Sequence, residues 1–229
     1  MTMMDALAPA RVRPADIDRV TTALLTGGIV AGPLYVTVSL TQALTRDGFD
    51  LTRHAWSVLA TGDLGWIQIT NFLIAGTLLI GFSLGLRRVW ADGPGHRWAP
   101  RLLAVHGLGM IAAGVLTADP SLGFPEGTPT DYRTMSWHGV GHMVAAMIAF
   151  LAVFACSLVV ARRFAAEGRS GWAVTSRVVG IGFLTTFVAL SASAGHPAAV
   201  VGFTVAVVVL MGWLAALAAD TRQRWSVTA

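Results

Sequence analysis

The sequence contains no lysine, a single cysteine and few charged residues of either sign. Only 12% of the 229 residues are charged, whereas soluble domains carry about 25%. So few charges leave too little polar surface to cover a globule in water, although they suit a lipid environment. The missing lysine excludes retinal and other Schiff-base chemistry. The lone Cys156 excludes an internal disulfide.

Long apolar segments dominate what is present, since 55% of the residues are hydrophobic and the mean hydropathy is +0.65. Each segment is near the ~20 residues that an α-helix needs to cross ~30 Å of hydrocarbon. They predict membrane spans at residues 21–44, 66–86, 102–118, 137–161, 174–193 and 198–219. We therefore expect an all-α, polytopic integral membrane protein: a bundle of six transmembrane helices at 21–219, with cytoplasmic tails at 1–20 and 220–229. In the third span, Gly107 and Gly114 predict close packing against neighbouring helices.

Arginine carries the whole basic charge and is concentrated in every second gap between these segments, on the side of both termini. Only Arg46, Arg53 and Arg133 fall on the other side. The positive-inside rule therefore places both termini in the cytoplasm. A composition rich in alanine, glycine, valine and arginine is typical of some bacterial genomes, so we expect a multi-pass protein of the bacterial inner membrane. The arginines lie at helix ends rather than in a basic domain, so the indicated partner is the lipid bilayer and not nucleic acid.

Two long loops are expected on the outer side, at residues 45–66 and 119–138. Long loops without regular structure in a compact protein are usually functional or disordered. Within the first loop, residues 54–60 have the pattern of a short helix lying on the membrane. Trp56 and Trp66 suit the membrane interface, where amphipathic rings settle.

Three ionisable residues of this outer side are the candidate catalytic groups: Asp119, His138 and His142. Asp119 precedes Pro120, and a residue before proline is pushed out of helical geometry, so the third helix should end at Asp119. His138 and His142 are four residues apart and share one face of the fourth helix. We therefore expect Asp119 and His142 to lie within direct or one-water reach of each other. A plain helix end exposed to water is the structural alternative for Asp119.

Further polar or aromatic residues near the same boundary are expected to shape a substrate pocket: Asp63, His196, Trp66, Gln68 and Asn71. Asp63 lies just before the second helix, where an N-cap or first-turn acid is a common structural alternative. His196 lies in the turn between the last two spans. Gln68 and Asn71 lie in the outer third of the second span, where they can line the cavity or bridge helices.

Three chemistries fit this polar group. The histidine pair with a further His or Asp can bind a metal, and Asp with His can act as an acid/base pair without a metal. The third alternative is a hydrogen-bonded cap that joins loops to helices. The metalloprotease motif needs His-Glu-x-x-His, and Gly139 occupies the place of that Glu. His106 lies nearer the cytoplasmic half than His142, which makes the two a poor pair of haem ligands.

Three stretches carry a resemblance to a known family: GFDLTRHAWSVLATGDLGWIQ, DPSLGFPEGTP and SWHGVGH. They resemble the six-helix bacterial membrane proteins catalogued as domain of unknown function 998. The resemblance covers residues 20–219 and implies a six-span fold. It implies no activity and supplies no functional residue.

The favoured hypothesis is a small membrane enzyme that acts by acid/base chemistry on a lipid-like or isoprenoid-like substrate. Cyclisation, isomerisation and hydrolysis all fit. Asp119 would be the acid or base, and His142 and His138 would be its partners. We expect no cofactor, with a metal ion as the less favoured alternative. The competing hypothesis is a non-catalytic membrane protein, either a transporter or a binding or assembly partner, whose polar cap is structural.

Overall fold

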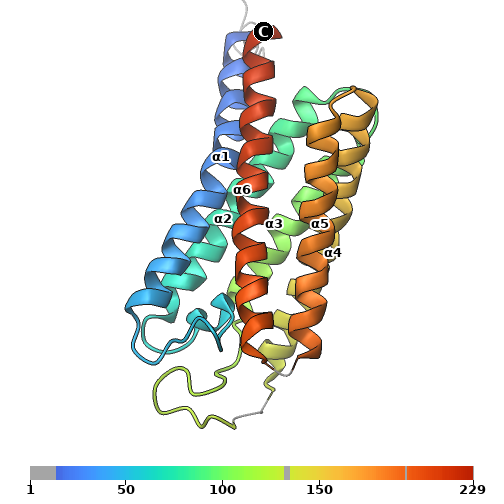
Figure 1. Ribbon diagram of the computed structural model, residues 1–229. Helices are drawn as coiled ribbons and strands as arrows, with labels where there is room; N and C mark the ends of the chain where they lie inside the picture. The colour runs from blue at the N-terminus through green and yellow to red at the C-terminus, as the bar shows by residue number, and fades with distance from the viewer. Residues whose placement is uncertain (1–13, 132–134, 194, 229) are drawn as a thin grey trace, which may run out of the picture.

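The computed structural model describes residues 14–131, 135–193 and 195–228, and within them it is entirely helical apart from loops. The elements in order are α1 (Pro14–Thr45), the short 3-10 helix η2 (Trp56–Ala60), α2 (Gly65–Val89), α3 (Trp98–Val115), α4 (Trp137–Ala166), α5 (Ser170–Ala192) and α6 (Pro197–Thr228) (Figure 1). All six long helices are long and apolar enough to cross a membrane. The predicted six-helix membrane fold is confirmed. Arg11, Arg13 and Arg133 lie outside the described residues.

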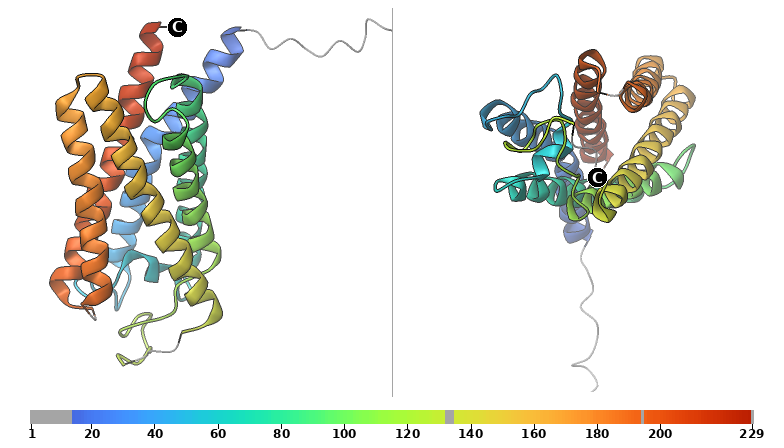
Figure 2. Two further views of the ribbon diagram at one scale, coloured as in Figure 1. Left: turned by 90° about the vertical axis from the view of Figure 1, so that its right-hand side faces the viewer. Right: turned by 90° about the horizontal axis from the view of Figure 1, so that it is seen from below.

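The six long helices form a ring. Each packs against its neighbours along the chain, and α6 packs against α1 to close the circle (Figures 1 and 2). The α2–α3, α4–α5 and α5–α6 connections are short, which favours antiparallel neighbours. Two glycines of α1 allow the closure: a Cβ on Gly28 would lie 2.9 Å from the Cβ of Ala218, and one on Gly32 would collide with the carbonyl of Met211. The start of α1 and the end of α6 therefore lie together at one end of the ring.

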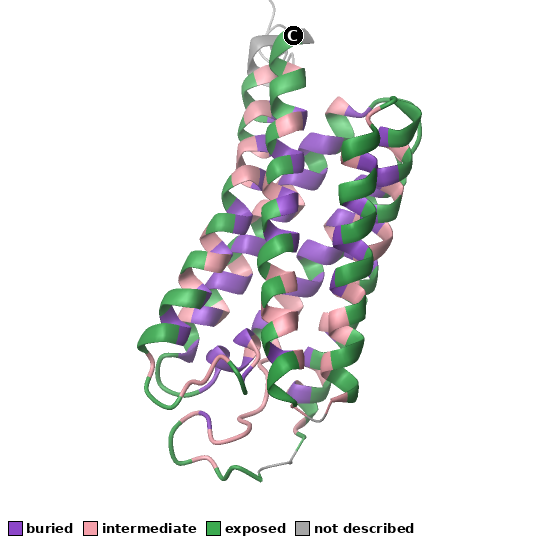
Figure 3. Cartoon of the chain, viewed as in Figure 1, coloured by how far each residue is buried: buried purple, intermediate pink, exposed green. Residues whose placement is uncertain are grey.

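Much of the outer surface of the helices consists of exposed residues (Figure 3). Many of these exposed residues have large apolar side chains. Leu108, Ile148 and Val178 are 57%, 52% and 64% exposed. A contiguous apolar surface of this kind is rare on soluble monomers, and it is what contact with lipid tails requires. The chain is therefore a multi-pass membrane protein.

Two predicted helix ends differ from the structure. α3 ends at Val115 rather than near Asp119, because the carbonyls of Ala113 and Leu116 accept a hydrogen bond from the ring of His142. α6 runs on to Thr228, beyond the predicted end at residue 219. Hydropathy marks only the part of a helix within lipid, whereas α6 continues as a polar helix that contains an ion pair between Asp220 and Arg224.

Ion pairs and aromatic rings close the arginine-rich end of the ring. Arg169, which precedes α5, forms two hydrogen bonds with the carboxylate of Asp220 on α6. Its guanidinium also lies 4.5 Å from the centre of the Phe164 ring on α4. Two hydrogen bonds between an arginine and one carboxylate fix the relative orientation of the two side chains better than a single hydrogen bond does. This end of α4, α5 and α6 is therefore joined by one arginine.

The predicted packing of Gly107 and Gly114 is confirmed. A Cβ on Gly107 would lie 2.8 Å from the carbonyl oxygen of Gly76 on α2, and one on Gly76 would lie 2.6 Å from the carbonyl oxygen of Gly107. A Cβ on Gly114 would lie 2.9 Å from the Cβ of Phe72. α2 and α3 thus approach backbone to backbone, as small residues allow in membranes.

Replacing Gly107 with Leu should destabilise the bundle, because the side chain must push α3 away from the α2 backbone. We expect a loss of about 1–3 kcal/mol, typical of overpacking, measured as a lower melting temperature in detergent. Gly182→Leu is the matched control, since nothing lies within 4 Å of a Cβ at Gly182. Equal melting temperatures for both variants would contradict this account of the α2–α3 contact.

Candidate functional site

The two long loops cover one end of the ring and are joined through His54. The backbone N–H of Asp50 donates to His54 Nδ1 at 2.9 Å, so the ring proton lies on Nε2, which donates to the carbonyl of Leu122 at 3.1 Å. The rings of Phe49 and Phe124 lie 5.1 and 5.6 Å from the imidazole centre. Burial lowers the pKa of His54, which favours the neutral ring that this pattern needs. His54 therefore joins the first loop to the second.

Arg46 holds the short helix η2 in place. Its guanidinium donates to the carbonyls of Leu59 at 2.6 Å and Thr61 at 2.8 Å, and lies 4.7 Å from the centre of the Phe124 ring. The short helix predicted in the first loop is present, but all of its residues except Ser57 are buried, and it packs against α1 and α2. Its expected position on the membrane surface is wrong, and Trp56 is buried rather than at the interface.

Asp119 organises the first turn of α4. One carboxylate oxygen accepts from the backbone N–H of Ser136 at 2.9 Å, and the other accepts from its hydroxyl at 2.6 Å. The Ser136 oxygen in turn accepts from the N–H of Gly139 as the N-cap of the helix. A Cβ on Gly139 would collide with the carboxylate. A negative charge at a helix N-terminus is favourable, so this geometry is that of an extended cap.

The sequence predicts that Asp119 and His142 lie within direct or one-water reach, and in the described part of the chain no direct hydrogen bond joins the two side chains. Of the two histidines it is His138 that approaches the carboxylate, with Nδ1 3.8 Å from Asp119 Oδ1. The same Nδ1 lies 2.9 Å from the carbonyl oxygen of Thr117. Asp119 and His138 thus lie together at the cap. His142 lies one helical turn deeper and is bound to the end of α3.

Three of the predicted pocket residues lie at the surface: Asp63, Trp66 and His196. Asp63 is not the N-cap of α2, because Leu64 occupies that position and no side chain caps the helix. His196 accepts from the backbone N–H of Ala198, which satisfies its own turn. The exposed ring of Trp66 suits the membrane interface, as expected. None of the three lines the cavity described below.

Gln68 and Asn71 bridge helices rather than line that cavity. Gln68 accepts from the amide of Gln42 at 2.8 Å and donates to the hydroxyl of Ser39 at 3.0 Å. The amide of Asn71 donates to the carbonyl of Tyr35 at 3.1 Å. All of these partners lie on α1. Of the two possibilities for this pair, the bridge between helices is the one that the geometry shows.

A cavity of about 130 Å³ lies inside the ring. Its walls are mainly aromatic and aliphatic, with Tyr35, Trp56 and Phe72 on the side of α1 and α2. The opposite wall consists of Phe150, Phe183, Phe187 and Phe203. His106 and His142 are its two ionisable polar members apart from Tyr35. Among the described residues that line it there is no Asp, Glu or Arg.

Both imidazoles of the cavity are bound to backbone carbonyls through Nδ1. His142 Nδ1 lies 2.9 Å from the carbonyls of Ala113 and Leu116, and His106 Nδ1 lies 3.1 Å from that of Ala149. A carbonyl only accepts, so each Nδ1 carries the proton and each neutral ring keeps a lone pair on Nε2. Within the described part of the chain, neither Nε2 has a hydrogen-bond partner, and that of His106 is fully buried.

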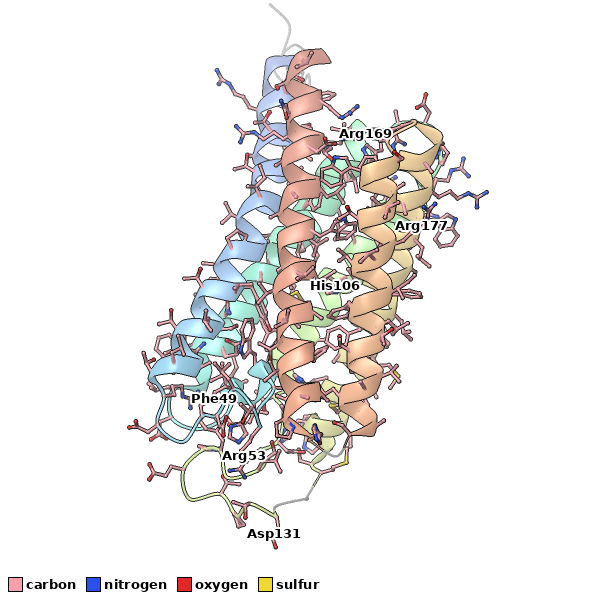
Figure 4. The ribbon with its side chains drawn as sticks, in the orientation of Figure 1. Phe49, Arg53, His106, Asp131, Arg169 and Arg177 are labelled. Carbon is pink, nitrogen blue, oxygen red and sulfur yellow. The ribbon has the colours of Figure 1, made fainter. Side chains whose placement is uncertain are left out.

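The two imidazoles lie at different depths. α3 and α4 are antiparallel, with His106 bonded to Ala149 and His142 bonded to Ala113, so the two levels are seven residues apart. At 1.5 Å per residue the offset is roughly 10 Å along the helices. Figure 4 shows His106 about half-way along the bundle, well separated from Phe49 in the covering loop. The two rings therefore cannot bind one haem iron from opposite sides, because such ligands need matching depth.

Sequence patterns do not identify three lining residues that matter most here: His106, Trp56 and Tyr35. From the sequence, His106 suggests only a haem ligand and Trp56 only an interface residue. A signal existed for the opposite wall, because Phe183 and Phe187 are four residues apart and therefore share one face of α5. No sequence pattern connects that face to the histidine of α3, which lies far away along the chain.

A model of a family of proteins of unknown function, DUF998, matches residues 29–220. The chain belongs to the DUF998 family. The match covers the whole cavity wall, from Tyr35 on α1 to Met211 on α6. No curated protein and no solved structure matches the chain. Membership of DUF998 confirms the expected resemblance and six-helix fold, and it adds no activity.

Proposed function

We propose that this DUF998 protein takes a lipid-like or isoprenoid-like molecule into the cavity inside its helix ring. The observation that carries the proposal is an apolar, aromatic-walled cavity with ring nitrogens that have no hydrogen-bond partner among the described residues. Small-molecule sites are typically concave and mostly apolar, with a few polar groups that fix orientation. Buried polar groups without partners are uncommon in native proteins. A ligand that supplies the partners accounts for both features.

The proposed entry route is from the bilayer rather than from water. The joined loops cover the ring at the end nearest the cavity, and Arg46 and His54 hold them closed. Met143 on α4 lines the cavity and is also 46% exposed. An apolar ligand is already concentrated in the bilayer, so a lateral route needs no passage through water.

The proposed orientation follows from the arginines, which put both termini in the cytoplasm of a bacterial cell and the joined loops outside. Thr128→Cys, in the second loop, should react with an impermeant thiol reagent in intact cells. Ala166→Cys, at the other end of α4, should react only after the cells are opened. Cys156 is buried and gives a low background. The reverse labelling pattern would overturn the orientation.

Filling the cavity tests the binding proposal. Ala146 lines the cavity, whereas Met147 beside it faces outward and is 49% exposed. A diazirine-bearing alkylbenzene should photolabel cavity residues of the protein in lipid nanodiscs, as mapped by mass spectrometry. Ala146→Phe should abolish that labelling because the added ring occupies the space, and Met147→Phe should leave it intact. Labelling confined to outward-facing residues in the unmodified protein would contradict the proposal.

Acid/base catalysis on the bound molecule is the second candidate function, and the unpaired Nε2 of His142 favours it. Two carbonyls fix the ring, and the free lone pair on the cavity wall is the arrangement of a general base. The Asp119 carboxylate, held at the start of the same helix, would favour the protonated ring that forms. In this proposal His142 touches the substrate, and Asp119 and His138 position the first turn of α4.

Two variants separate the chemical from the structural role. His142→Asn retains a donor for the α3 carbonyls and removes the base, so it should keep photolabelling and melting temperature but lose conversion by about 10²-fold or more. Asp119→Asn should instead lower stability by about 1–3 kcal/mol, because one of the two partly buried Ser136 donors loses its carboxylate acceptor. Conversion is measured by comparing the lipid species of membranes with and without the protein.

Unchanged lipid profiles for the unmodified protein would exclude the catalytic candidate. Unchanged stability for Asp119→Asn with lost conversion would return Asp119 to a catalytic role.

A further inference from the structure

We infer that the cavity selects an uncharged ring that carries a hydroxyl group, with the hydroxyl donating to His106 Nε2. The ligand class is a phenol-like headgroup whose apolar tail remains in the bilayer. This inference rests on the proposed binding function and adds the chemistry of the ligand. Three independent properties of the cavity carry it: its size and wall, its lack of charge, and its unpaired ring nitrogens.

The size and the wall fit one ring. The cavity of about 130 Å³ is close to the ~150 Å³ apolar cavity known to bind benzene. Its wall is already a set of aromatic contacts, with the Phe150 ring 5.0 Å from Phe183, 4.9 Å from Phe187 and 5.7 Å from Phe203. Aromatic rings attract one another at 4.5–7 Å in tilted or edge-on arrangements. A ligand ring would extend this cluster into the empty space.

The absence of charge excludes ionised headgroups. No Asp, Glu or Arg occurs among the described lining residues, and the sequence has no lysine. A phosphate, a carboxylate or an ammonium group would therefore enter a membrane-buried space without a counter-charge, which is costly. Phospholipid headgroups, diphosphates and ionised fatty acids do not fit the cavity. Neutral molecules do.

The unpaired nitrogens specify the polar group. His106 Nε2 accepts and Trp56 Nε1 donates; both atoms are buried and, within the described residues, have no hydrogen-bond partner. His142 Nε2 is a second acceptor on the same wall. Ether and ketone oxygens only accept and cannot satisfy an imidazole lone pair, whereas a hydroxyl donates as well as accepts. The hydroxyls of Ser57 and Thr204 in the cavity can donate or accept a hydrogen bond, so they do not favour one ligand oxygen over another.

His106 is the residue to which we assign the hydroxyl, because its Nε2 is buried and has no hydrogen-bond partner among the described residues. Its ring lies within the membrane-spanning part of α3 and is 1% exposed. Nδ1 holds it against the α4 backbone, so Nε2 has a fixed direction. A buried acceptor without a donor is unfavourable, and in an apolar setting it stays unsatisfied unless a ligand or an ordered water supplies the hydrogen. The ligand hydroxyl supplies it.

Four ligands that differ in one group test the inference: 4-octylphenol, 4-octylanisole, octylbenzene and 4-octylbenzoate. Each competes with the diazirine-bearing alkylbenzene for photolabelling of the protein in nanodiscs. The phenol should compete about tenfold or more better than the anisole or octylbenzene, because only it can donate to the imidazole. The benzoate should compete worst. In His106→Phe the preference of phenol over anisole should fall to within about twofold, whereas His196→Phe, at an exposed histidine, should retain it.

The outcomes separate this inference from the binding proposal. If no ligand competes and the cavity is not labelled, the proposed function fails. If phenol, anisole and octylbenzene compete equally, the cavity binds apolar molecules and the hydroxyl assignment is overturned. A best-binding benzoate overturns the argument from charge. A phenol preference that persists in folded His106→Phe overturns the assignment of His106. If that variant does not fold, the comparison of the four ligands on the unmodified protein still decides the ligand class.

Discussion

A bilayer offers no hydrogen-bond partners, and this constraint explains most of the polar contacts in the bundle. Gln68 and Asn71 bind the α1 side chains and backbone, and His142 binds the last carbonyls of α3. Each contact satisfies a group that lipid cannot. Against this background His106 Nε2 is one of a few buried polar atoms without a partner among the described residues, and it shares the cavity lining with another, Trp56 Nε1. The same constraint that stabilises the other polar groups makes these two atoms the best indicators of a ligand.

The cavity results from an uneven distribution of small and large residues around the ring. Glycines bring α2 against α3 and α1 against α6 until backbones touch. On the side of α4, α5 and α6, phenylalanines hold the helices apart and surround the empty space. Tight packing at two contacts thus fixes a ring whose centre cannot be filled by its own side chains. The cavity therefore depends on the difference between the small residues at some helix contacts and the large residues at others.

The charged residues lie at the two ends of the bundle, and they form different contacts at each end. At the arginine-rich end, Arg169 and Asp220 join α5 to α6. At the loop end, Arg46 fixes η2 and Asp119 fixes the start of α4. At this end Arg46, His54 and Asp119 form hydrogen bonds to the loops and to the first turn of α4. They close the cavity and position the histidine that faces it. The chemistry proposed for the site is one turn or more deeper in the membrane.

The sequence by itself determined the fold class, because length and hydropathy are local properties and a bilayer has a fixed thickness. It also determined the tight glycine contacts of α3 and the existence of a short helix in the first loop. Only the tertiary structure decided which polar residues share a site. Asp119 and His142 are near one another along the boundary, yet the α3 carbonyls bind the histidine and Ser136 binds the carboxylate. His106, Trp56 and Phe187 meet at one cavity although they come from three distant segments, since that contact depends on how the ring closes and no local pattern encodes it.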